Sequence, residues 1–170
     1  MKKKQQKMKQ PQAMSLLIQV VYWCFFIIVA LFLQFFIPGV DIMLAGLLII
    51  IPERKILQTI LLFCIFIILQ EATGILTFGL LLLEYSVLIL SFFIGRTIFA
   101  VGTFSFVFLL SLFISFVYFV LIQIFGALQG IYVSPTSAMY DSILQALLVP
   151  LVWYPMQHLY GRYVRRGNTI

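Results

Sequence analysis

The chain has 170 residues, of which 64% are apolar and only 9% are charged. Soluble domains carry about 25% charged residues and about 45–50% apolar ones, so this composition excludes a water-soluble protein and predicts an integral membrane protein. Because each membrane-spanning helix takes about 20 residues, we expect one all-α helical bundle without a separate globular domain.

Few residues are suited to catalysis or metal binding. His158 is the single histidine, and Cys24 and Cys64 lie in apolar runs without a second ligand at metal-binding spacing. The sequence has no glycine-rich phosphate loop and no Gly-x-Ser-x-Gly or His-Glu-x-x-His motif. We therefore expect a protein that is not an enzyme and that needs no cofactor or metal.

The net charge of +6 comes from short basic clusters rather than from a continuous basic face, which disfavours nucleic acid as a partner. Basic clusters beside apolar runs set membrane orientation, because Lys and Arg stay on the cytoplasmic side. They predict basic cytoplasmic tails at residues 1–14 and 161–170, with anionic lipid headgroups as partners of these termini. The basic residues are Lys2, Lys3, Lys4, Lys7, Lys9, Arg54, Lys55, Arg96, Arg162, Arg165 and Arg166.

The first two apolar runs differ in length. Residues 15–36 form a run of 22 residues, too long for the apolar part of a signal peptide at about 7–15 residues, and predict an uncleaved first span. Residues 42–51 would make only about 15 Å of helix, against a hydrocarbon layer of about 30 Å. Extended back to Pro38, this run predicts a short second span at 38–51.

The remaining runs predict four further spans. Residues 56–95 would make a helix of about 60 Å, so the run must turn back, and its polar break at 70–74 divides it into spans 56–69 and 75–95. The fifth span is expected at 103–125 and the sixth at 142–160, joined by a connection at 126–141. The predicted bundle thus occupies residues 15–160.

The charge distribution favours six spans. With six, all 11 Lys and Arg fall on the cytoplasmic side, while Asp41, Glu71 and Asp141 fall outside. If the second run did not cross, six of the 11 basic residues would move outside. The positive-inside bias therefore predicts six transmembrane helices with cytoplasmic N- and C-termini and a short second helix.

Glu84 is the one charged residue near the middle of a predicted span, where an ionised side chain costs at least about 2.5–3.5 kcal/mol. One interpretation is a proton- or solute-binding site. The alternative, which we favour, is a neutral carboxyl that is hydrogen-bonded to Gln123, Gln145 or Tyr85 across the bundle or to a partner helix.

Two further sets of residues are candidate interaction sites. Ser111 and Ser115 lie four residues apart on one helix face, which indicates close packing inside the bundle or against a partner helix. Pro150 removes the helical donor from the carbonyl of Ala146. With Gln145 nearby, Pro150 either lines a polar cleft or has its freed carbonyl satisfied by a neighbouring helix.

Four short motifs follow one another along the chain. They are Leu31-Phe32-Leu33-Gln34, Pro52-Glu53-Arg54, Glu71 with Gly74 and Phe78-Gly79, and Leu147-Leu148-Val149-Pro150 before the basic tail. Together these motifs resemble the MreD family of rod shape-determining proteins. The resemblance implies a non-catalytic scaffold of the cell-wall elongation machinery in the bacterial inner membrane, with Glu71 as the acid that closes the third span. It implies as partners the bitopic protein MreC and the MreB-associated complex for peptidoglycan synthesis.

Two other functions stay open. A similar six-helix architecture occurs in the substrate-binding membrane component of energy-coupling-factor vitamin transporters, and there Glu84 and a polar cleft would hold the ligand. The chain lacks polar and aromatic residues on its extracytoplasmic connections that would cap a vitamin. The other alternative is a small structural subunit of a larger membrane complex.

Overall fold

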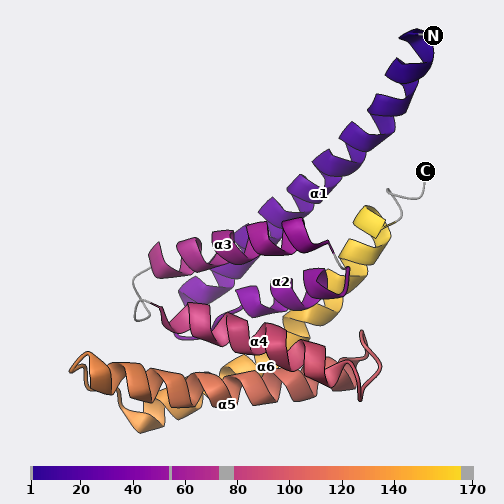
Figure 1. Ribbon diagram of the computed structural model, residues 1–170. Coiled ribbons are helices and arrows are strands. Elements are labelled where there is room, and N and C mark those ends of the chain that lie inside the picture. Colours follow the sequence, from indigo (N-terminus) through magenta and orange to yellow (C-terminus); the bar gives the residue numbers. More distant parts are fainter. Residues whose placement is uncertain (1, 54, 73–78, 166–170) are drawn as a thin grey trace.

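The computed structural model describes residues 2–53, 55–72 and 79–165, and this part of the chain is helical without any strand (Figure 1). The prediction of an all-α fold with six helices is confirmed. The expected start of the fourth span at residue 75, together with Arg54 and Arg166, lies outside the described residues. The elements are α1 (Lys2–Phe36), α2 (Met43–Ile50), η1 (a 3-10 turn, Ile51–Glu53), α3 (Ile56–Ala72), α4 (Leu80–Gly95), α5 (Phe104–Leu128), α6 (Pro135–Leu159) and the π-helical η2 (Tyr160–Arg165).

Helix boundaries differ most from the predicted ones at α1 and between α5 and α6. Helix α1 continues back from the predicted start at residue 15 to Lys2, so the basic N-terminal segment is helical. The connection expected at 126–141 is only 129–134, because α6 already begins at Pro135. Proline suits the first position of a helix, where its missing N–H is not needed, and Ser134 occupies the N-cap position.

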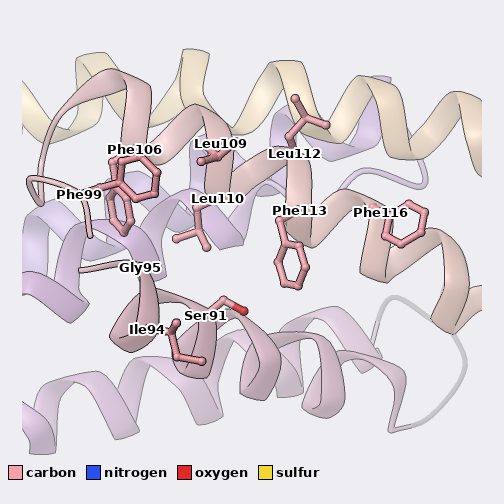
Figure 2. A pocket seen from close by; sticks show the side chains of 10 residues that line it. All are labelled: Ser91, Ile94, Gly95, Phe99, Phe106, Leu109, Leu110, Leu112, Phe113 and Phe116. Carbon is pink, nitrogen blue, oxygen red and sulfur yellow. The ribbon is translucent and has the colours of Figure 1, made fainter. Parts of the chain in front are cut away.

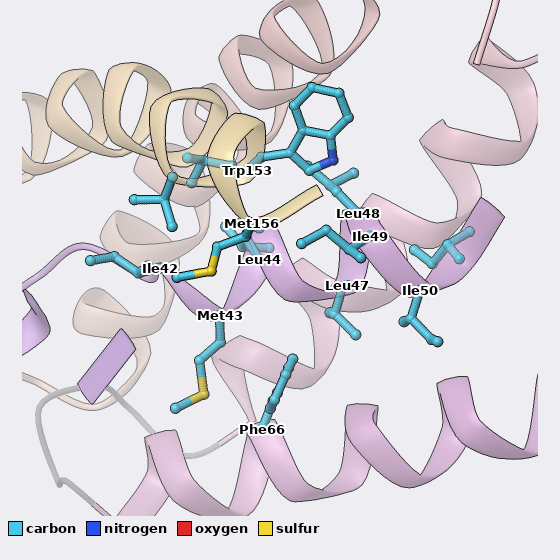
Figure 3. Packing of buried hydrophobic residues seen from close by; sticks show 14 of the residues in the cluster. Ile42, Met43, Leu44, Leu47, Leu48, Ile49, Ile50, Phe66, Trp153 and Met156 are labelled. Carbon is cyan, nitrogen blue, oxygen red and sulfur yellow. The ribbon is translucent and has the colours of Figure 1, made fainter. Parts of the chain in front are cut away.

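Helix α2 lies at the centre of the molecule. All eight of its residues are buried, with α6 on one side and α3 on the other (Figure 3). Gly46 allows this packing, because a Cβ there would lie 2.6 Å from Cε1 of Phe26 in α1 and 2.9 Å from Cε2 of Phe66 in α3. The shortness predicted for the second helix therefore corresponds to an element that is surrounded by longer helices.

The other helices pack around α2. Helices α4, α5 and α6 pack in the order of the chain, and α3 lies on the far side of α4 from α5 (Figure 1). At the end of the chain, η2 packs against α1, where the rings of Tyr22 and Tyr160 are 5.2 Å apart. The Tyr22 hydroxyl donates to the backbone oxygen of Met156 at 3.0 Å, which ties α1 to α6.

The connections between helices gather at two opposite ends. At one end, the turn after α1 meets the start of α6, since a Cβ on Gly39 would lie 2.8 Å from Cγ of Asp141. At the other end, Pro52 of η1, Val101 between α4 and α5, and Gln157 of α6 line a common cavity of about 270 Å³. The connection after α1 therefore lies near the beginning of α6, and the connections after α2 and α4 lie together near the end of α6.

The outer surface is apolar and the interior contains polar side chains. Phe35, Leu57 and Leu128 are 83%, 82% and 77% exposed, and many other large apolar side chains lie on the outside of α1 and α3 to α6. Soluble monomers rarely expose apolar surface on this scale. Residues 17–36 of α1 and all of α5 are long and apolar enough to cross a membrane, whereas α2 with η1, α3 and α4 are apolar but shorter.

Candidate functional site: a buried polar network

Five polar side chains from five segments meet inside the bundle. None is more than 6% exposed, and Gln70, Glu84 and Gln145 are fully buried. Buried polar groups are costly unless they are hydrogen-bonded, so a network of this size needs internal partners. The five residues are Gln34 of α1, Asp41 in the turn before α2, Gln70 of α3, Glu84 of α4 and Gln145 of α6.

The first half of the network joins α1, α2 and α3. The side chains of Gln34 and Gln70 exchange two hydrogen bonds, of 2.7 Å and 3.2 Å, between their amide groups. Gln70 Nε2 also donates to Asp41 Oδ1 at 2.7 Å, and that oxygen accepts from the backbone N–H of Met43 at 2.8 Å. Asp41 therefore caps the first turn of α2 and ties this helix to its neighbours.

The second half of the network is organised by Gln145. Its Oε1 accepts from the backbone N–H of Asp41 at 3.4 Å, and its Nε2 donates to Glu84 Oε1 at 2.7 Å. Gln145 is thus the partner of Glu84 among the three that the sequence offered. One amide side chain on α6 connects the segment that holds Asp41 with the helix that holds Glu84.

Asp41 is the residue that sequence reasoning missed. We expected it on the outer side of the membrane, at the beginning of the short second span, but its side chain is only 1% exposed and belongs to the network. The turn residues Pro38 and Gly39 made an aqueous position the natural interpretation. A weak signal was present, because an acid two residues before a helix can cap its first N–H.

The network leaves one oxygen of each carboxyl without a hydrogen-bond partner, namely Asp41 Oδ2 and Glu84 Oε2. The hydroxyl of Tyr118 also lacks a partner and lies within electrostatic range of Glu84, whereas the hydroxyl of Tyr85 is directed at Asp41. Among the buried side chains that the structure describes there is no Lys or Arg. Two carboxyl groups therefore share a dry site without a basic partner.

Ser111 and Pro150 form a separate polar contact between α5 and α6. Pro150 cannot donate to the carbonyl of Ala146, and Ser111 Oγ donates to that oxygen at 2.9 Å instead. Ser115, one turn further along α5, is 3% exposed and its Oγ has no partner. Ser111 and Ser115 therefore pack inside the bundle, which is one of the two arrangements that their spacing indicated. A neighbouring helix, α5, supplies the hydrogen bond to the carbonyl that Pro150 leaves without a donor.

Glu71 lies outside the network, although its neighbour Gln70 belongs to it. Its Oε1 accepts from the backbone N–H of Gly79 at 3.1 Å, so it links the end of α3 to the residue that precedes α4. Gly79 has a φ of 84°, a backbone conformation that favours glycine. Glu71 therefore connects the end of α3 to the residue that precedes α4.

An apolar groove of about 630 Å³ runs between α4 and α5 on the outer surface (Figure 2). Phe99, Phe106, Phe113 and Phe116 line it, and Ser91 contributes the only polar side chain. The groove is lined by different residues from the polar network. It offers an apolar surface of the kind that a partner helix covers in a membrane.

The fold and the network define a helical bundle with an apolar exterior and a polar network inside its apolar core. The chain matches no family profile, no curated protein and no solved structure.

Proposed function

We propose that this chain is a multi-pass protein of the bacterial inner membrane, with six membrane-spanning helices and both termini in the cytoplasm. The positions of three connections support this topology. The turn at Gly39 lies close to Asp141 at the expected outer end, and Pro52, Val101 and Gln157 lie together at the expected inner end.

The short helices fit this proposal because of where they lie. Helices α3 and α4, with 17 and 16 residues, would extend about 24–26 Å, slightly less than a hydrocarbon layer of about 30 Å. Local thinning of the bilayer accommodates a mismatch of this size. Helix α2 is shorter still, but it is enclosed by protein and has no surface that must match the lipid.

We further propose that the protein is a non-catalytic scaffold of the cell-wall elongation machinery, as its resemblance to the MreD family implies. The observation that carries this proposal is that the polar contacts lie inside the bundle, whereas the groove on its outer surface is apolar. The interior polar groups join helices to one another, while the apolar groove between α4 and α5 faces outward, where the membrane helix of a bitopic MreC-like partner would pack. The basic termini would contact anionic lipid headgroups.

Depletion of the protein in its host, combined with affinity purification and mass spectrometry, tests the scaffold proposal. We expect depleted cells to become round, and the tagged protein to co-purify an MreC-like protein together with the MreB-associated complex. Normal rods with impaired vitamin uptake would contradict the proposal and favour the energy-coupling-factor alternative. Normal rods with normal uptake, and a different set of co-purified membrane proteins, would favour the structural-subunit alternative.

A matched pair of variants tests the role of the groove. Leu109 lines the groove and is 49% exposed, whereas Leu151 is 66% exposed on the outside of α6. Leu109→Trp is expected to reduce co-purification of the MreC-like partner, because the larger side chain occupies the groove. Leu151→Trp makes the same change elsewhere on the apolar surface and should leave co-purification intact. Equal effects of the two variants would remove the groove from the proposal.

A further inference from the structure

The two buried carboxyl groups of the network lack a countercharge. Asp41 lies in the turn before α2, and Glu84 lies in α4. The side chain of Gln145 accepts a hydrogen bond from the backbone N–H of Asp41 and donates one to the carboxyl group of Glu84. The two acidic residues also lie within electrostatic range of one another. Two carboxylates that share a dry site cannot both stay ionised without a cation, because each disfavours the charge on the other.

We propose that Asp41 and Glu84 form a buried binding site for one monovalent cation, either a proton or Na⁺. The inference does not depend on the scaffold role. The cation would be held by the carboxyl oxygens that have no protein partner, Asp41 Oδ2 and Glu84 Oε2.

The hydroxyls around the pair are a second observation that points to a ligand. Tyr118 is 1% exposed, its hydroxyl oxygen has no hydrogen-bond partner, and it lies within electrostatic range of Glu84. Tyr85 is fully buried and directs its hydroxyl at Asp41. A buried hydroxyl without a partner is rare, and the Tyr118 hydroxyl adds an oxygen atom near the two free carboxyl oxygens.

The donor set favours a monovalent over a divalent cation. Calcium and magnesium need about six or more oxygen ligands, and in proteins these usually include several carboxylates or bound waters. The described residues contain no group of three or more His, Cys, Asp or Glu that could hold a metal ion. A single positive charge leaves the pair with at most one negative charge, which the N-terminus of α2 beside Asp41 helps to stabilise.

Among the residues that the structure describes, no buried basic side chain supplies the missing charge. The remaining polar side chains of the network are the amides of Gln34, Gln70 and Gln145, and the nearby hydroxyls belong to Tyr85 and Tyr118, so all of them are neutral. A further acidic group lies close by: Asp141 is within electrostatic range of Tyr118 and contacts Gly39, two residues from Asp41. Asp141 is partly exposed, so it marks an acidic approach for a cation from the expected outer end.

Thermal unfolding of the purified protein in detergent tests the site. NaCl is titrated at a mildly alkaline and a mildly acidic pH, with choline chloride as the control for ionic strength. If Na⁺ binds, the unfolding temperature at alkaline pH should rise by about 3–6 °C for each tenfold increase in Na⁺ above its dissociation constant. The rise should shrink at acidic pH, because protons then occupy the same oxygens. If the site takes only protons, stability should fall as the pH rises, without any effect of Na⁺.

Conservative variants assign the effect to the pair. Glu84→Gln and Asp41→Asn keep the shape of the side chain and remove one charge, so each should abolish the dependence on Na⁺ or pH. Glu71→Gln makes the same change outside the network and should retain it. A wild-type protein whose unfolding responds to neither Na⁺ nor pH, or a Glu84→Gln variant that responds as the wild type does, would overturn the proposal.

A measurement on the wild-type protein tests the site even if the variants do not fold. Addition of NaCl to the protein in weakly buffered solution should release protons if Na⁺ displaces them, and choline chloride should release none. In a site that takes only protons, Na⁺ releases none, and a potentiometric titration should instead reveal one group that binds its proton well above the ordinary range of carboxyls. Failure of both measurements contradicts a cation site.

Discussion

Pro150 and Ser111 show how one residue creates a requirement that another residue meets. Proline at position 150 leaves the carbonyl oxygen of Ala146 without its helical donor, and Ser111 Oγ supplies a hydrogen bond of 2.9 Å from α5. We predict that Ser111→Ala lowers the free energy of unfolding by about 1 kcal/mol, the usual net value of one hydrogen bond. The same substitution in a Pro150→Ala background should cost close to nothing, because the restored backbone N–H donates to Ala146.

A double-mutant cycle, with unfolding followed by circular dichroism in detergent, measures this coupling. Ser115→Ala is the matched control, since the Ser115 hydroxyl has no partner and lies one turn away on the same helix. Its loss should change stability little in either background. A cost for Ser111→Ala that is the same with and without Pro150 would contradict the proposed link between the two residues.

At the residue scale, the sequence revealed half of the buried carboxyl pair. Glu84 was found because a carboxyl in a long apolar run has no aqueous interpretation. Asp41 follows Pro38 and Gly39 at the edge of a run, where an acid is ordinarily solvated. Its burial depends on Gln70 and Gln145, which lie 29 and 104 residues further along the chain, so no local pattern contains the information.

At the scale of elements, the central helix α2 was predicted as short, and the reason for its shortness is visible in the structure. Asp41 satisfies the N–H of its first residue, and Pro52 lies in the 3-10 turn that follows its end. The sequence left open whether longer helices surround this segment or the bilayer thins beside it. It did not predict that every residue of α2 would be buried, because burial on all sides depends on how α3 and α6 pack.

Gly46 makes this packing testable. A Cβ at this position would lie 2.6 Å from Phe26 and 2.9 Å from Phe66, closer than carbon atoms can approach. We predict that Gly46→Ala destabilises the protein by about 1–3 kcal/mol, the typical cost of adding a methyl group to a full core. Phe26→Leu in the same chain should recover part of this loss, because it removes the ring atoms nearest to the new methyl group.

The control for this prediction is Gly161→Ala. No atom lies within 4 Å of a Cβ at Gly161, so the same substitution there adds a methyl group in open space. Thermal unfolding of both variants and of the Gly46→Ala, Phe26→Leu double variant gives the comparison. If the Gly46→Ala and Gly161→Ala variants unfolded at the same temperature, the result would contradict the close packing of α1, α2 and α3 around Gly46.

For the whole molecule, charge and packing support the same topology by independent routes. The charge count uses only the positions of Lys and Arg between apolar runs. The packing uses contacts between residues that are distant in sequence, such as Gly39 with Asp141 at one end of the bundle. The sequence could not predict those contacts, and it placed the start of α6 later than Pro135 because a polar stretch resembles a connection.

The six-span topology predicts on which side of the membrane each connection lies. Reporter domains fused after Lys55 and after Thr97 should be cytoplasmic, because these sites follow the second and fourth spans. A fusion after Tyr132, which is 88% exposed in the connection before α6, should be extracytoplasmic. Alkaline phosphatase activity marks the outer side and fluorescence of a green fluorescent protein marks the inner side, so each site is tested with both reporters. If α2 did not cross, both reporters would change sides, with Lys55 outside and Tyr132 inside, and the positive-inside argument would fail.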